Sequence, residues 1–147
     1  MSFALDLQQF ATKTNAKANA VVRKIVIDVG TALVMKSPVG DADYWISPAP
    51  PGYVGGRFRA NWQYGLSAPD ISTSESVDPS GLAAIGGITT KVPSDAGGSM
   101  HYITNSLPYG PRLEEGYSKR QAPHGMVAIT VLEFQPIVTA AARALNT

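Results

Sequence analysis

The chain has 147 residues and a mass of 15.5 kDa, and 44% of its residues are hydrophobic, which suits one domain with a real core. Its 12 basic and 11 acidic residues leave a formal charge of +1, which excludes a global field that would attract nucleic acid or an anionic membrane. The lack of cysteine excludes disulfides and thiolate metal sites.

The N-terminal third predicts one long helix. The start lacks the pattern of a signal peptide, and the longest apolar runs are far shorter than the ~20 residues that a membrane-spanning helix needs, so we expect no membrane partner. From Leu7 onwards, apolar or small residues recur at three- and four-residue steps. This pattern predicts an amphipathic helix over about residues 5–36, which Ser37-Pro38 ends because proline lacks an N–H group.

Residues 39–56 follow, with a composition that disfavours both helix and central strand. They combine glycine and proline with large aromatic side chains, which predicts an exposed arm or an ordered loop. Tyr44, Trp45 and Tyr53 are candidate contacts to a neighbouring subunit, since buried aromatic side chains anchor many interfaces. The alternative is that they fold back over the domain's own core.

The run Arg57–Leu66 alternates in type and predicts a half-buried strand. Its aromatic side is formed by Phe58, Trp62 and Tyr64, and its polar side begins with Arg57 and Arg59. Arginines interleaved with aromatic rings can also grip nucleic acid. We favour arginines that pair with carboxylates across a subunit boundary, because the charge of the whole chain is close to zero.

The remaining elements complete an α+β domain over residues 1–147. We predict a short helix capped by Ser80 and ending before Gly86-Gly87, a strand over Met100–Thr104, and a pairing segment or turn over Leu113–Gly116. A last helix, about Gly125–Leu145, has to kink or break at Pro136. The small, mainly antiparallel sheet should pack against the N- and C-terminal helices.

The sequence gives only weak indications of a catalytic site. His101 and His124 have no Cys, Asp or Glu at metal-ligand spacing, and the adjacent pair Glu114-Glu115 diverges on either a strand or a helix. Gly86–Lys91 lacks the glycine that precedes the lysine of a phosphate loop. We therefore predict no catalytic, cofactor or metal site. The alternatives are a hydrolase or nuclease that uses these histidines and glutamates, and a nucleic-acid-binding module.

Several short runs, in this order, give the chain a family resemblance. They are SPVG at 37–40, GRFRANWQ at 56–63, NSLPY at 105–109, RLE-x-GYS at 112–118 and AP-x-GM at 122–126. Together with a helix before and after them, they resemble the neck or tail-completion proteins of long-tailed bacteriophages. The stretch Asp41–Gly55 departs from the pattern, in which a short link is commoner.

The resemblance implies a structural, non-enzymatic virion subunit without a cofactor. Such a subunit forms a ring of its own copies around the DNA exit channel and joins the connector of the head to the tail tube. A tail terminator or a minor tail protein is the alternative within the same assembly. The residues at signature positions or next to them become interface candidates: Arg57, Phe58, Arg59, Trp62, Tyr109, Arg112, Glu114 and Tyr117.

Overall fold

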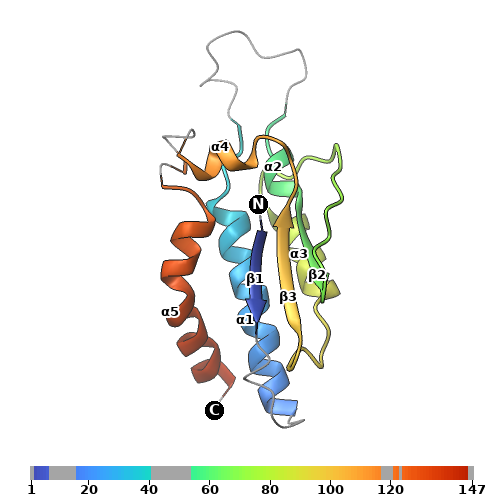
Figure 1. Ribbon diagram of the computed structural model, residues 1–147, viewed down its shortest axis with the longest axis vertical. Coiled ribbons are helices and arrows are strands. Elements are labelled where there is room, and N and C mark those ends of the chain that lie inside the picture. Colours follow the sequence, from blue (N-terminus) through green and yellow to red (C-terminus); the bar gives the residue numbers. More distant parts are fainter. Residues whose placement is uncertain (1, 7–15, 41–53, 117–120, 123, 146–147) are drawn as a thin grey trace.

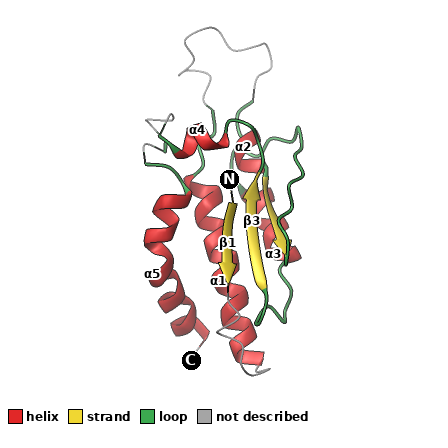
Figure 2. Cartoon of the chain, in the orientation of Figure 1, coloured by secondary structure: helices red, strands yellow, loops and turns green. Residues whose placement is uncertain are grey.

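The sheet of this α+β domain lies in front of two helices, and a third helix stands beside them (Figures 1 and 2). The computed structural model describes residues 2–6, 16–40, 54–116, 121–122 and 124–145. Three strands form the sheet in the order β1-β3-β2, with β1 at Ser2–Asp6, β2 at Trp62–Leu66 and β3 at Met100–Asn105. Both outer strands run antiparallel to β3.

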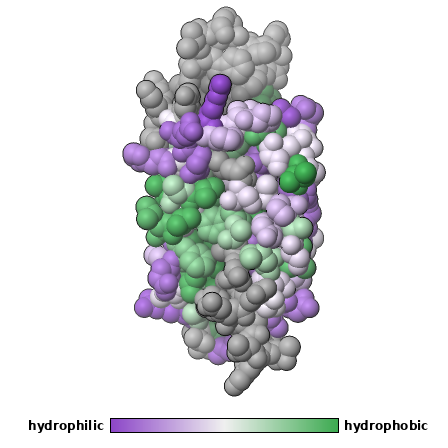
Figure 3. Space-filling model, viewed as in Figure 1, coloured by the Kyte–Doolittle hydropathy of each residue, from purple (hydrophilic) through white to green (hydrophobic). Residues whose placement is uncertain are grey.

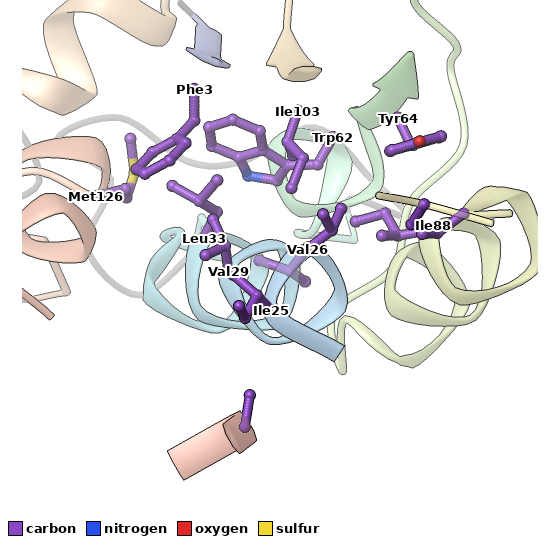
Figure 4. Packing of buried hydrophobic residues seen from close by; sticks show 14 of the residues in the cluster. Phe3, Ile25, Val26, Val29, Leu33, Trp62, Tyr64, Ile88, Ile103 and Met126 are labelled. Carbon is purple, nitrogen blue, oxygen red and sulfur yellow. The ribbon is translucent and has the colours of Figure 1, made fainter. Parts of the chain in front are cut away.

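The long helix α1, Ala16–Lys36, is the centre of the core. It packs against the sheet, against α3 (Leu82–Lys91) and against α5 (Val127–Leu145), so that α3 and α5 lie on opposite sides of it (Figure 4). The side chains at its centre are fully buried. They belong to Ile25, Val26, Val29 and Leu33, which recur at helical spacing.

Two buried hydrogen bonds to one serine hydroxyl fix the end of α1. The Ser37 hydroxyl donates to the Leu33 carbonyl oxygen at 2.7 Å and accepts from the indole N–H of Trp62 at 2.7 Å. A helix end leaves carbonyl groups without partners, and this serine satisfies one of them while it also pairs the buried indole. The predicted end of the helix at Ser37-Pro38 is therefore confirmed.

The predicted start of that helix is wrong. Residues 2–6 form β1, in which Phe3 lies opposite Ile103 and is buried in the core. A strand forms there because β3 offers an edge about a hundred residues away, which local periodicity cannot reveal.

The predicted strand over Arg57–Leu66 is correct only from Trp62 onwards. Arg57–Ala60 forms the short helix α2, which begins after Gly56 in the left-handed conformation with φ 106°. The Asn61 side chain then donates to the carbonyl oxygens of Arg57 and Ser74 and accepts from the Ser74 amide, which ends the turn and ties it to the next loop. Because aromatic and polar residue types alternate from Arg57 onwards as they do in a strand, the pattern did not indicate this helical turn.

Three further expectations about elements change. The helix expected to stop before Gly86-Gly87 continues through both glycines to Lys91 as α3. Of the segment expected to pair or turn at Leu113–Gly116, the first two residues end α4, Gly110–Glu114, and the last two form a turn. The last helix, α5, runs from Val127 to Leu145 and continues through Pro136, so the expected break there does not occur. The strand expected at Met100–Thr104 is confirmed and extends to Asn105.

Among the described helices, α5 is long and apolar enough to cross a membrane, judged by length and composition. Its apolar residues are not continuous, because Glu133, Gln135 and Arg143 interrupt them, and the absence of a membrane partner stays a prediction. One such helix is weak evidence for a membrane, because helices of soluble proteins meet the same criterion. Here α5 packs along α1, and its Glu133 carboxylate pairs with the Lys36 ammonium at 2.7 Å.

Candidate interaction site

The two apolar aromatic rings of the Arg57–Gln63 run lie inside the domain. Phe58 is 4% exposed and Trp62 is 2% exposed, and their rings meet edge to face with centroids 5.8 Å apart. This corrects their assignment as contacts to a neighbouring copy, because a side chain so buried offers almost no surface to a partner. Tyr109, at 38% exposure, packs on the outside of Phe58 and remains accessible.

Arg59 binds main-chain groups of its own chain. Its guanidinium donates to the carbonyl oxygens of Met35 and Ser37 at the end of α1 and to that of Pro79. Burial lowers the pKa of Arg59, and the Asp78 charge opposes this shift. The side chain therefore clamps the C-terminal end of α1 to the loop before α3, where a cation also complements the helix dipole.

Arg57 lies closer to the surface. It donates to the Ser74 carbonyl oxygen at 3.2 Å and to the Glu75 carboxylate at 3.0 Å, and the Glu75 side chain is 90% exposed. An ion pair with such exposure contributes about 0–1 kcal/mol. The arginine pairs with a carboxylate of its own chain and not, as expected, with one across a subunit boundary.

Glu114 caps the last helix. Its Oε1 atom accepts from the amides of Met126 and Val127, and its Oε2 atom accepts from the amide of Ala128. These amides belong to the first turn of α5 and the residue before it, where N–H groups lack partners within the helix and the dipole favours a negative charge. Gly125 makes the contact possible, because a Cβ atom there would lie 2.5 Å from both the Glu114 carbonyl oxygen and Oε2.

The two ends of the 39–56 segment meet at the same end of the molecule. The Gly56 amide donates to the Val39 carbonyl oxygen at 2.6 Å, and the Val39 amide donates to the Gln121 side chain at 2.7 Å. The interface candidates Tyr44, Trp45 and Tyr53 lie outside the described residues, and so does Tyr117. Arg112 is exposed on α4 and, with Tyr109, remains available to a partner.

The described apolar surface has two other parts that the sequence did not single out. On α5, Val131 is 55% exposed and Leu132 is 76% exposed, and hydrophobic residues gather over this helix (Figure 3). On the other side of α1, a cleft of about 230 Å³ opens between β2, α3 and residues 74–78. Its lining mixes apolar groups such as Tyr64, Val77 and Ile88 with a polar rim.

The histidines and glutamates that a hydrolase would use lie apart. His101 is fully buried at the start of β3, where its Nε2 atom bonds to the Ala96 carbonyl oxygen at 2.8 Å and its Nδ1 atom to the Tyr64 hydroxyl at 2.7 Å. Glu114 lies on α4, beyond the opposite end of that strand, and its carboxylate is occupied by α5. His124 is exposed. Within the described ranges, no three His, Asp or Glu side chains gather to hold a metal ion.

Comparisons with models of known protein families, with curated proteins and with solved structures gave no match.

Sequence reasoning missed the cleft and the outer face of α5 for different reasons. The cleft depends on residues 74–78 lying across β2, which Asn61 arranges through its bonds to Ser74. The α5 face had a partial sequence signal: Leu132 falls outside the helical stripe of Val127, Val131, Phe134, Val138 and Ala141, whereas the exposure of Val131 could not be read from its spacing. Large apolar residues outside the buried stripe of a helix indicate a surface that can bind a partner.

Proposed function

We propose that this chain is a structural subunit of the head–tail joint of a long-tailed bacteriophage. It assembles as a ring of identical copies around the DNA exit channel and connects the head connector to the tail tube. In this role it acts in the virion and not as an enzyme. Any contact with DNA is independent of sequence and uses Lys or Arg side chains on phosphates.

One observation carries the proposal. The short runs that give the family resemblance are far apart in the sequence, yet they pair through hydrogen bonds in two groups at the same end of the molecule (Figure 1). Ser37 binds Trp62, Asn105 donates to the Phe58 carbonyl oxygen at 2.8 Å, and Glu114 caps the helix that follows Met126.

This convergence supports treating the runs as parts of one unit. Independent chance matches would have no reason to contact one another. Five runs that contribute to the same end of a domain are consistent with a fold shared with the resembled family, and we infer the joint function from that resemblance by analogy.

The test is a phage particle that lacks this protein, viewed by negative-stain electron microscopy. Loss of a joint subunit should leave DNA-filled heads and finished tails that do not join, and added wild-type protein should restore joined particles. Tails of irregular length would favour the tail terminator. Particles that are complete and infectious without the protein would exclude the joint and the terminator alike.

The enzyme alternative has a separate test. Purified protein should not turn over phosphoester, peptide or glycan substrates. Activity that disappears in His124→Ala, with an unchanged circular dichroism spectrum, would overturn the structural role.

A further inference from the structure

We propose that the outer edge of β2 binds an extended, uncharged peptide segment of another protein. The main chain of the peptide pairs with the main chain of Tyr64, and one of its apolar side chains enters the cleft beside α3. A peptide that adds a strand to a sheet edge in this way obtains affinity from main-chain hydrogen bonds and specificity from side-chain pockets. The site follows from the hydrogen bonding of β2 and does not depend on the proposed role at the head–tail joint.

Alternate residues of β2 turn their main-chain groups away from the sheet. Directly after the strand, the Ser67 amide donates to the Met100 carbonyl oxygen at 2.9 Å. Bonded and non-bonded positions alternate along an antiparallel pair, so Gly65, two residues earlier, pairs with β3. Tyr64 and Leu66 therefore direct their N–H and C=O groups to the outer edge, where no strand follows β2 in the described sheet.

The outward groups of Tyr64 are buried and unpaired. Among the residues that the structure describes, none bonds to its main-chain N–H or C=O group, although its hydroxyl bonds to His101 at 2.7 Å. Tyr64 is 6% exposed as a whole. Buried main-chain groups nearly always have a partner in folded proteins, so this pair indicates a place for one.

The geometry of these groups selects an extended chain as the partner. A strand offers N–H and C=O groups to its neighbour at every second residue, which matches the spacing of Tyr64 and Leu66. A helix uses its main-chain groups within itself and has none to offer along its length. An apolar ligand without donors and acceptors would leave both groups of Tyr64 unpaired.

The chain that follows β2 leaves room for such a strand. Residues 67–78 run from the end of β2 back to its beginning (Figure 1), where Ser74 bonds to the Asn61 side chain. The Asp78 amide then donates to the Gly56 carbonyl oxygen at 3.0 Å. Between this returning segment, β2 and α3 lies the cleft of about 230 Å³. Tyr64 is part of its wall, so a peptide in the cleft can reach the unpaired groups.

The α3 wall of the cleft suits an apolar side chain of the peptide. Small residues form this wall, namely Ala83, Ala84 and Gly87, and Val77 and Ile88 add larger apolar groups. A Cβ atom at Gly87 would meet nothing within 4 Å, so the space above this residue is open. An apolar side chain that fills a pocket of this kind acts as the anchor of an interface.

The charged groups of the cleft already have partners. The Asp78 carboxylate accepts from the Ala84 amide at 2.9 Å and from the Ser80 hydroxyl at 3.2 Å. The charge of Lys91 acts on Asp70, whose pKa it helps to lower. A charged peptide side chain would enter this partly apolar cleft at a desolvation cost, so we expect the bound residue to be uncharged.

Amide hydrogen exchange followed by NMR tests the pairing residue by residue. The probe is a capped pentapeptide of alternating threonine and valine, which is uncharged and favours an extended conformation. In the free protein the Tyr64 amide should exchange faster than the Gly65 amide, which pairs with β3. Excess peptide should slow exchange at Tyr64 by about tenfold or more and leave Gly65 unchanged. A Tyr64 amide as protected as that of Gly65 without peptide would overturn the proposal, and so would no protection at the highest soluble peptide concentration.

N-methylated probes test whether the main chain of the peptide forms the contact. Methylation of both valine amides removes the donors of one peptide edge, and methylation of the central threonine amide removes a donor of the other edge. Since only one edge can face β2, one of these probes should lose the protection at Tyr64 and the other should keep it. Equal protection by both probes would show that the peptide does not pair as a strand.

Two glycine variants of α3 test the place of the side chain. Gly86 and Gly87 both lie inside the helix with open space for a side chain, but of the two only Gly87 lines the cleft. Gly87→Leu should weaken binding of the unmethylated probe by about tenfold or more, whereas Gly86→Leu should bind it like the wild type. Circular dichroism checks that both variants fold. Equal affinities would place the peptide outside the cleft and overturn the proposal. Because these assays use the isolated chain and the joint role is judged in particles, either proposal can fail alone.

Discussion

At the scale of single residues, one carboxylate stabilises the start of a helix that begins thirteen residues later. Glu114→Ala removes the acceptor for the amides of Met126, Val127 and Ala128, and we expect it to lower the free energy of unfolding by about 1–3 kcal/mol. Urea denaturation measures the change. Glu115→Ala is the matched control, since Glu115 is exposed, and it should stay within about 0.5 kcal/mol of the wild type. Equal losses in the two variants would contradict the cap.

A second residue makes stability depend on pH. Burial lowers the pKa of His101, opposed by its bond to the Ala96 carbonyl oxygen, while burial raises the pKa of Tyr64 to about 12. Because a carbonyl oxygen can only accept, Nε2 carries the proton and Nδ1 accepts from the Tyr64 hydroxyl.

The direction of this pH dependence follows from how many protons the folded and the unfolded chain bind. As pH falls below about 6.5, the unfolded chain takes up a proton at His101 that the folded chain does not, so the free energy of unfolding should decrease toward pH 5. His101→Gln should flatten this slope, although it lowers stability at neutral pH. His124→Gln, at an exposed position, should keep the slope of the wild type, and so we would measure thermal unfolding of all three between pH 7 and pH 5.

At the scale of elements, glycines have opposite roles in neighbouring helices. Gly86→Ala adds a methyl group to open space within α3 and should stabilise the domain by about 0.5–1 kcal/mol.

Gly56→Ala should destabilise the domain by at least about 1–2 kcal/mol, because φ is 106° and the new Cβ atom would lie 2.5 Å from the Pro79 nitrogen. Thermal denaturation distinguishes the two, and a loss on Gly86→Ala would show that the helix needs this glycine.

Pro136 interrupts the hydrogen bonds of α5 without ending the helix. The pyrrolidine ring has no N–H to donate to the Leu132 carbonyl oxygen, and proline in a helix interior costs about 3 kcal/mol. We expect Pro136→Ala, at an exposed position, to raise the free energy of unfolding by about 1–3 kcal/mol in urea titrations. A decrease would mean that the curvature of the helix around Pro136 fits α1 better than a regular helix does.

Elements whose residues interact locally were predictable from the sequence. The end of α1 at Ser37-Pro38 and the strand at Met100 follow from proline chemistry and from alternation. β1 was missed because it depends on β3, and α2 was missed because Phe58, Trp62 and Tyr64 alternate as a strand would while Gly56 imposes a turn.

The candidate site was harder to predict because it also depends on contacts between residues that are far apart in the sequence. The Arg57–Gln63 run was predicted to contribute interface residues, but Phe58 and Trp62 support the fold from inside. The type of a residue indicates what it can bind, whereas burial decides whether a partner can reach it, and burial depends on contacts far apart in the sequence.

For the whole molecule, the position of α1 predicts that the domain unfolds as one cooperative unit. It contacts the sheet, α3 and α5, so that no other element can leave without exposing its apolar face. Leu33→Ala, at a fully buried position, should cost about 2–5 kcal/mol. In a Trp45→Phe background, the midpoints from Trp62 fluorescence and from far-UV circular dichroism should shift together. Separate midpoints would show that α5 unfolds on its own.

The bond between Gly56 and Val39 has a practical consequence. Since Val39 and Gly56 are held together by a hydrogen bond, the length of the sequence between them contributes only a slowly growing closure entropy. A peptide tag could replace residues 41–53 without moving the ends that hold it. The position is therefore suited to attaching a fluorescent or affinity label for locating this protein within a larger particle.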